Sequence, residues 1–257
     1  MCGGKKAAAV FIKRWLQLAV PYVNFKILNP AKEINTYDTY GLILSSQEIG
    51  LPSVKTKFID IDGRNGSLDM TEAFDEVLYG DRTLTFTFNI VSDIYAWDEL
   101  RTRIANDLHG RRCQITIYSD SDIHYVGQIP YDLSYFYIGR CMIDKYQSSK
   151  GLGTIVIKCI CDPFKFGLDK NKDITLGTTE ITTVTETFEV DGVLTEIYCQ
   201  TINAESSYTT FKIDDGPKFA LPKKSGGYYP TAIGKGQHTI QVTGQGSAKI
   251  TYQEKYI

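Results

Sequence analysis

The side chains best suited to acid–base or nucleophilic chemistry are three histidines, His109, His124 and His238. Nucleophilic catalysis needs a serine or cysteine beside a histidine base that a carboxylate orients, and the sequence contains no nucleophile-elbow pattern. His109 follows a predicted helix, where a cation complements the helix dipole, so we interpret it as a C-terminal capping residue. His124 and His238 fall in predicted strands and are expected to face solvent. The histidines therefore do not indicate an active site.

Paired carboxylates are the second chemistry to consider, because most glycosidases use two of them. The fold, rather than the spacing in the sequence, sets the separation of about 5–10 Å that sugar hydrolysis needs. Solvated acids are routine near turns and strand ends, so the chain is predicted not to be an enzyme, with a glycan hydrolase as a third alternative. The acids in such positions are Glu196, Glu205, Asp214 and Asp215.

One polar segment begins like a calcium loop. Asp60, Asp62 and Gly63 resemble the start of an EF-hand, but Arg64 and Thr71 occupy the positions that require Asp or Asn and Glu. We therefore expect no metal and no other cofactor. The segment is interpreted as a turn, or as an arm that contacts a neighbouring subunit. The residues assigned to that arm are Asp60, Asp62, Arg64 and Asn65.

The six cysteines do not form a framework. They are spread unevenly, and Cys159 and Cys161 stand two positions apart in a predicted strand, so both face the same side. The CxxC and histidine pairs of zinc sites are missing. We interpret the cysteines as buried structural thiols of a protein that assembles in a reducing cytoplasm.

The bulk composition favours a β-rich protein of one or two domains. The 257 residues include 17 Tyr and 12 Phe, which together with Thr, Ile and Val suit pleated surfaces. The formal charge of −2 argues against broad binding to phosphate backbones, so no sequence-specific nucleic-acid partner is expected. The apolar run at residues 7–12 is broken by Lys13 and Arg14 and is too short to span a membrane. Residues 1–33 are treated as an N-terminal extension of unknown role.

Two hydrophobic periodicities organise residues 34–167. Residues 83–90, TLTFTFNI, alternate apolar residues with threonine and predict a strand. Apolar residues then recur at steps of three and four, which places them on one face of a helix. Ser92 or Asp93 would cap the start of this helix and Gly110 would end it. The predicted helix-core residues are Ile94, Trp97, Leu100, Ile104 and Leu108. Further strands are predicted at 40–45, 54–61, 114–118, 123–128, 136–144 and 153–161, with a long loop or arm over 60–69.

A second β unit is predicted after residue 167. Pro163 cannot donate to a central ladder, so the first sheet should end there, and the polar residues 168–179 are interpreted as a linker. Residues 180–257 show short strands separated by glycine-rich turns, which is typical of a compact sandwich or jelly roll. Both tryptophans, Trp15 and Trp97, lie outside this unit. An aromatic platform for a glycan would therefore use Tyr228 and Tyr229; the alternative is an ordinary surface loop.

Several short sequence motifs between residues 34 and 166 occur in the order and spacing of a known protein family. They are TYGLIL at 39–44, IDIDGRNGSLDMTE at 59–72, RTLTFTF at 82–88, Trp97 with Leu100, LHG at 108–110 and CDPF at 161–164. This series resembles the distal tail proteins of long-tailed, non-contractile (siphovirus-type) phages, although Ile61 and Asp62 stand where that family usually has a proline. The phrase GKGQHTIQVTGQGSAKITY at 234–252 is similar to the last hairpin of the galectin-like domain that such proteins often carry.

The resemblance implies a mainly β fold, with an N-terminal β-sandwich carrying one α-helix, followed by a galectin-like or jelly-roll β-sandwich. It implies a structural virion protein at the tail tip, assembled in the host cytoplasm as a homo-hexameric ring. Such a ring joins the tail tube protein to the tail-associated lysin or hub protein, and its outer domains can hold receptor-binding or adhesion proteins. The alternative function is a cell-surface glycan-binding adhesion module that acts through the C-terminal sandwich.

Overall fold

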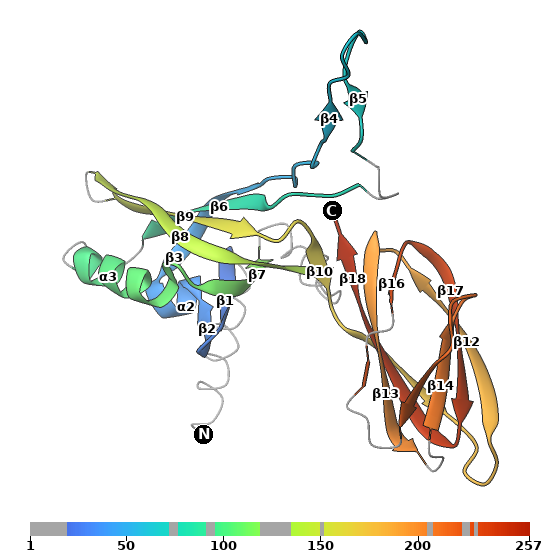
Figure 1. Ribbon diagram of the computed structural model, residues 1–257. Helices are drawn as coiled ribbons and strands as arrows, with labels where there is room; N and C mark the ends of the chain where they lie inside the picture. The colour runs from blue at the N-terminus through green and yellow to red at the C-terminus, as the bar shows by residue number, and fades with distance from the viewer. Residues whose placement is uncertain are drawn as a thin grey trace, which may run out of the picture. The chain divides into compact units, whose positions relative to one another are not determined.

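The computed structural model describes residues 20–71, 77–90, 96–118, 135–149, 152–204, 208–222, 227–228 and 231–257. The chain divides into two compact units, Met1–Lys165 and Phe166–Tyr256, and each unit has a hydrophobic core of its own. Both units are built mainly from antiparallel strands (Figure 1). The protein is therefore mainly β, as its composition and periodicities predicted.

The strands of the first unit pair in the order β2-β1-β7-β8-β9-β6-β3. The N–H of Leu44 in β3 donates to the carbonyl of Pro21, just before β1, at 2.9 Å. Because β3 reaches back to β1 in this way, the sheet folds over on itself as a sandwich. The strands are β1 (Tyr22–Leu28), β2 (Ala31–Asn35), β3 (Leu42–Ile49), β6 (Arg82–Ile90), β7 (Arg112–Tyr118), β8 (Tyr135–Ser149) and β9 (Leu152–Cys161).

The core of this unit follows from alternation along the strands. In β6, Leu84, Phe86 and Phe88 are buried while the threonines between them are more exposed, which confirms the strand predicted over 83–90. In β8, Gly139 faces Cys161 of β9, and a Cβ atom at position 139 would lie 2.6 Å from the carbonyl oxygen of Ile160. A side chain has no room there, so glycine lets the two strands approach.

The predicted helix is present as α3 (Trp97–Leu108). Trp97, Leu100, Ile104 and Leu108 are buried, whereas Ile94, Ser92 and Asp93 lie outside the described residues. The N-cap is Ala96, whose side chain makes no capping hydrogen bond, and Gly110 takes a φ of 75° just beyond the helix.

His109 is the C-cap of α3, as predicted, and its backbone N–H donates to the carbonyl of Ala105 at 3.0 Å. Its ring Nδ1 accepts a hydrogen bond from the N–H of Ile143 at 3.1 Å, so the ring ties the end of α3 to β8. The ring therefore contributes a contact to a strand amide in addition to the backbone cap.

A short second helix, α2 (Thr36–Tyr40), was not expected. Asn35 caps it, because its Oδ1 accepts from the N–H groups of Tyr37 and Asp38 at 2.9 and 3.1 Å. Gly41 ends it with a φ of 67°, in the left-handed region that favours glycine. The first unit therefore carries this single turn in addition to the predicted helix.

The described boundaries differ from those predicted at two places. Residues 22–33 are not an extension, since β1 and β2 belong to the first sheet and Val23, Phe25 and Ile27 lie in its core. Residues 168–179 are not a plain linker, since β11 (Lys170–Thr175) pairs with β18 (Gly246–Tyr256) and buries Ile174. Both segments form strands because they pair with strands that are distant in the sequence.

The second unit is a sandwich of two sheets. One has the order β16-β13-β18-β11 and the other the order β12-β17-β14-β15. Their inner faces form one core, which includes Ile197, Phe211, Ile240 and Ile250. The remaining strands are β10 (Lys165–Gly167), β12 (Thr182–Val190), β13 (Leu194–Ala204), β14 (Tyr208–Ile213), β15 (Phe219–Pro222), β16 (Ala232–Ile233) and β17 (Gly236–Gly244). A β-sandwich is thus present in this unit, and it includes β11, which lies before the predicted start at residue 180.

Candidate functional site

An extended ribbon leaves the first unit between β3 and β6, and Figure 1 shows it standing away from the other strands of that unit. We call residues 50–80 the arm. Its two runs are joined by backbone hydrogen bonds from Gly80 to Ser53 at 2.7 Å and from Lys55 to Leu78 at 2.8 Å. The arm ends in the hairpin of β4 (Phe58–Ile59) and β5 (Leu68–Asp69). Of the strand predicted over 54–61, only β4 is present. The loop or arm predicted over 60–69 forms the tip of the arm.

The arm exposes apolar side chains. Leu51 is 79% exposed and Phe58 is 59% exposed. An isolated two-stranded hairpin is at best marginally stable in water, and exposed apolar patches generally mark interaction surfaces. The arm is therefore a candidate site for a protein partner. Its other exposed apolar residues are Val54, Ile59, Ile61, Val77 and Leu78.

The four charged or polar residues assigned from the sequence all lie at the arm's tip. Asp60, Asp62, Arg64 and Asn65 are exposed, and Asp60 Oδ1 accepts a hydrogen bond from the hydroxyl of Ser67 at 2.6 Å. Across the described ranges, no group of three or more His, Cys, Asp or Glu side chains is placed to hold a metal ion. What the tip presents is a set of solvated charges that a partner surface could contact.

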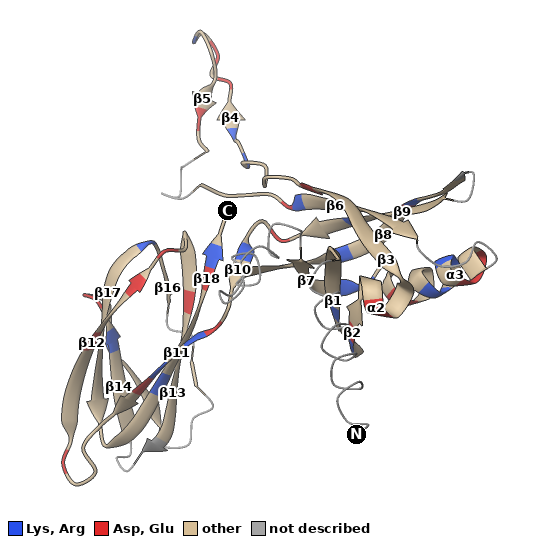
Figure 2. Cartoon of the chain, turned by 180° about the vertical axis from the view of Figure 1, so that it is seen from behind, with Lys and Arg blue, Asp and Glu red and all other residues tan. Residues whose placement is uncertain are grey.

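Charge does not single out another site. Figure 2 shows Lys and Arg interspersed with Asp and Glu on the strands and on α3. Exposed ion pairs such as Arg112 with Asp162 at 2.7 Å account for several of them. Such pairs contribute little stability because water and salt screen them.

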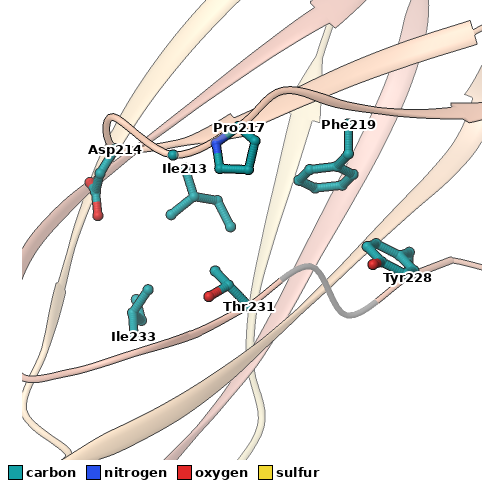
Figure 3. A pocket seen from close by; sticks show the side chains of 8 residues that line it. Ile213, Asp214, Pro217, Phe219, Tyr228, Thr231 and Ile233 are labelled. Carbon is teal, nitrogen blue, oxygen red and sulfur yellow. The ribbon is translucent and has the colours of Figure 1, made fainter. Parts of the chain in front are cut away.

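A pocket of about 380 Å³ lies in the second unit (Figure 3). One row of its lining comes from the end of β14 and the connection to β15, and the other from the segment that leads into β16. Phe219 stacks on buried Phe211 with ring centroids 5.4 Å apart, and Tyr228 lies 5.6 Å from Phe219. The aromatic wall is therefore held by the core. The lining residues are Ile213, Asp214, Gly216, Pro217, Phe219, Tyr228, Thr231 and Ile233.

Asp214 is the charged residue among the described lining residues, and hydrogen bonds fix the position of its carboxylate. Its Oδ2 lies 2.7 Å from Nδ1 of His238, and its Oδ1 accepts from the N–H of Thr239 at 2.7 Å. Partial burial raises the pKa of Asp214, but the hydrogen bonds from His238 and Thr239 outweigh it and hold the pKa below its ordinary value. The carboxylate is thus ionised at neutral pH.

The structure places the two candidate glycan contacts differently. Tyr228 lines the pocket and is 51% exposed, whereas Tyr229 lies outside the described residues.

His238 was expected to face solvent, but its ring is mostly covered and paired with Asp214, because β17 turns it toward the inside of the sandwich. His124 lies outside the described residues. Sequence reasoning did not connect Asp214, Phe219 and Thr231. Their only visible signal was the Asp-Asp-Gly-Pro turn at 214–217.

The cysteines of the described residues are buried thiols. Cys113, Cys141, Cys159, Cys161 and Cys199 are unpaired by disulfides, and Cys141 Sγ lies 3.3 Å from Cys159 Sγ. Burial raises the pKa of Cys161 and of Cys199 to about 12. The thiols of Cys161 and Cys199 are therefore protonated, and all five are shielded, as structural cysteines are.

The fold defines a mainly β protein of two sandwich units, and it occurs in a solved phage protein. The chain is similar to the Dit (gp 19.1) protein of SPP1, described as a paradigm of the hub adsorption apparatus in phages that infect Gram-positive bacteria. The two share 15% sequence identity with a TM-score of 0.61, over 93% of this chain and 100% of that chain. No family model and no curated protein sequence matches this chain. Among the described residues, no helix is long and apolar enough to cross a membrane.

Proposed function

We propose that this chain is a structural virion protein that forms a ring at the distal end of a phage tail. The observation that carries the proposal is the fold shared with the Dit protein of SPP1, which extends over both units. The ordered sequence phrases that resemble distal tail proteins point the same way. The proposed ring is a homo-hexamer that joins the tail tube protein to the lysin or hub protein at the tip. It would be assembled in the host cytoplasm, and its role is structural rather than enzymatic.

The arm gives the ring a physical basis. Head-to-tail contacts between identical subunits close into a ring when the rotation between neighbours is right. Such a contact needs about 800 Å² of buried surface per partner. The exposed Leu51, Phe58 and Ile61 offer the apolar centre of a contact, and the charged tip around Asp60 and Arg64 offers its polar rim. For these reasons we propose that the arm of each subunit contacts the neighbouring subunit of the ring.

Burial favours the arm over the helix as the ring contact. In α3, Trp97, Leu100, Ile104 and Leu108 are already covered by the first unit's own core, so this face has little apolar area left to offer. The outer face of the same helix carries charges, among them the pair of Arg101 with Asp98 at 2.8 Å.

Mass photometry and negative-stain microscopy of the purified full-length chain test this proposal. We expect hexamers with a central opening that appear as the concentration rises. A chain that stays monomeric at high concentration, with the tail tube and hub proteins added, would overturn it. Receptor-binding or adhesion proteins are the further partners expected on the second unit, and pull-down from assembled tails would identify them.

A further inference from the structure

We propose that the pocket of the second unit binds one neutral hexopyranose ring. This goes beyond the ring-forming role, which does not use the pocket. The volume of about 380 Å³ falls at the lower end of the range of about 300–1,000 Å³ typical of small-ligand sites. A single ring with some ordered water suits that size better than a long chain lying in a groove.

The apolar part of the lining fits the C–H face of a sugar. Tyr228 and Phe219 lie along one end of the pocket, with Pro217 and Ile213 beside them (Figure 3). The negative face of an aromatic ring attracts the weakly positive C–H groups of a sugar. The apolar area of the ring also keeps water away from these groups. Since Phe219 is stacked on buried Phe211, part of this platform is already in place before a ligand binds.

The polar part of the lining fits the hydroxyl groups at the edge of a sugar. The hydroxyl of Thr231 donates to the carbonyl of Ala232 at 3.1 Å, which leaves its oxygen able to accept. Asp214 offers a carboxylate whose direction is fixed by His238 and Thr239. Asp214 takes a φ of 45°, a left-handed conformation that non-glycine residues adopt rarely and mostly as Asp or Asn.

Charge argues against an anionic ligand, and the placement of the aromatic rings argues against a quaternary ammonium. Among the described residues, the lining includes one carboxylate and no Lys or Arg, so these residues would repel a uronic acid, a sialic acid or a phosphate. A quaternary ammonium ligand is typically held by aromatic rings around its charge. Figure 3 shows Asp214 at the opposite end of the pocket from Tyr228, so carboxylate and aromatic ring do not form such a cage.

Saturation-transfer NMR on the full-length chain tests the site. The probes are methyl glycosides of glucose, galactose, N-acetylglucosamine and rhamnose, with the free sugars, glucuronic acid, choline and isobutanol beside them. We expect transfer to at least one neutral sugar and none to glucuronic acid. Transfer to the methyl glycoside indicates a sugar that is bound as part of a polysaccharide, and transfer to the free sugar alone indicates a small metabolite.

Variants separate the pocket from the rest of the unit. Tyr228→Ala removes an exposed ring and is expected to weaken binding about tenfold. Thr231→Trp places an indole at an exposed position beside the pocket and should abolish binding by filling it. Tyr208→Ala is the matched control, because Tyr208 is an exposed tyrosine at the other end of β14 and does not line the pocket. Thermal unfolding of each variant shows whether it is folded.

Three results would overturn the proposal. The first is no saturation transfer to any neutral sugar. The second is unchanged transfer in folded Tyr228→Ala and Thr231→Trp, and the third is transfer to choline or isobutanol alone. The last would indicate a cation or an apolar side chain of a partner protein as the occupant. Because the measurement requires neither a ring nor tail partners, its failure would leave the tail role standing, and failure to form hexamers would leave the pocket standing.

Discussion

The hydroxyl of Tyr40 donates a hydrogen bond to Oδ2 of Asp107 at 2.7 Å, across 67 positions in the sequence. Oδ1 of the same carboxylate lies 2.6 Å from Nζ of Lys32. Arg103 covers the ring of Tyr40 at 5.2 Å and donates to the carbonyl of Thr39 at 2.6 Å. These contacts join the C-terminal half of α3 to α2 and β2, so they fix the helix on the sandwich of the first unit.

Tyr40→Phe removes one hydrogen bond of this group and keeps the ring. Because the acceptor is a carboxylate and Tyr40 is buried, we expect the free energy of unfolding to fall by about 1.5 kcal/mol. Urea unfolding of the full-length chain, followed by tryptophan fluorescence, measures it. Tyr37→Phe, in the same helical turn but less buried, is the control and should change little. Equal stability of the two variants would show that the Tyr40 hydroxyl adds nothing.

Acid should weaken the same junction. Partial burial raises the pKa of Asp107, but hydrogen bonds from Lys32 and Tyr40 outweigh it and hold the pKa below its ordinary value. The contribution of Asp107 is therefore present above the unfolded-state pKa of about 4 and is lost as pH falls through the lower folded-state value. Urea midpoints measured over this range should fall with pH in the wild type and fall less in Asp107→Asn. Asp144→Asn, at an exposed position of β8, is the control. Parallel curves for wild type and Asp107→Asn would contradict the assignment.

Polar substitutions in the arm should prevent assembly without unfolding the subunit. Phe58→Ser combined with Ile61→Ser removes apolar side chains that no core of the first unit covers. If they form the centre of the contact, each ring interface loses about 2 kcal/mol or more, roughly thirtyfold in affinity. Mass photometry would then detect monomers at concentrations where the wild type forms rings.

Leu152→Ser with Ile181→Ser is the matched control for the arm, because it removes two exposed apolar side chains elsewhere. Rings should persist in that variant. Alanine at Asp60, Asp62, Arg64 and Asn65 should weaken assembly less than the apolar changes, because exposed charges contribute little. Normal rings in the Phe58 and Ile61 double variant would show that the arm is not the ring contact.

The buried thiols should resist modification. The thiolate is the reactive form, and burial both raises the pKa of Cys161 and Cys199 to about 12 and keeps reagents out. Mass spectrometry after iodoacetamide treatment should find Cys113, Cys141, Cys159, Cys161 and Cys199 unmodified in the native chain and alkylated in urea. Rapid labelling of any of them in the folded protein would be incompatible with the packing described above.

The elements that were predictable are those whose pattern is local. The alternation of Leu84, Phe86 and Phe88 with threonines is a property of nine consecutive residues of β6, and the helical stripe of α3 lies within twelve. The pairing of the elements that were missed depends on distant partners. β1 was missed although Val23, Phe25 and Ile27 alternate as clearly as the buried residues of β6; only its place beside β7, which begins at Arg112, depends on a distant segment. In β11, only Ile174 is buried, so pairing with β18 rather than hydrophobic pattern makes it a strand.

The two candidate sites divide in the same way. The arm's tip was visible in the sequence, because a run of Asp, Gly and Asn residues predicts turn chemistry wherever it occurs. The pocket was not visible, because it forms only where a turn after β14 meets the segment before β16. Asp214 and His238 stand 24 positions apart, and the strand register of β14 on β17 brings them together.

The amino-acid sequence alone determined that the chain is rich in strands, that one amphipathic helix follows β6, and that an acidic, glycine-containing segment interrupts the first unit. These follow from side-chain periodicity and turn preference, which act between near neighbours. Only the tertiary structure decided which strands pair, that the arm is a ribbon with uncovered apolar residues, and that Tyr228, Phe219 and Asp214 share one pocket. Strand pairing and burial join segments far apart in the chain, and their energies depend on geometry that no local pattern contains.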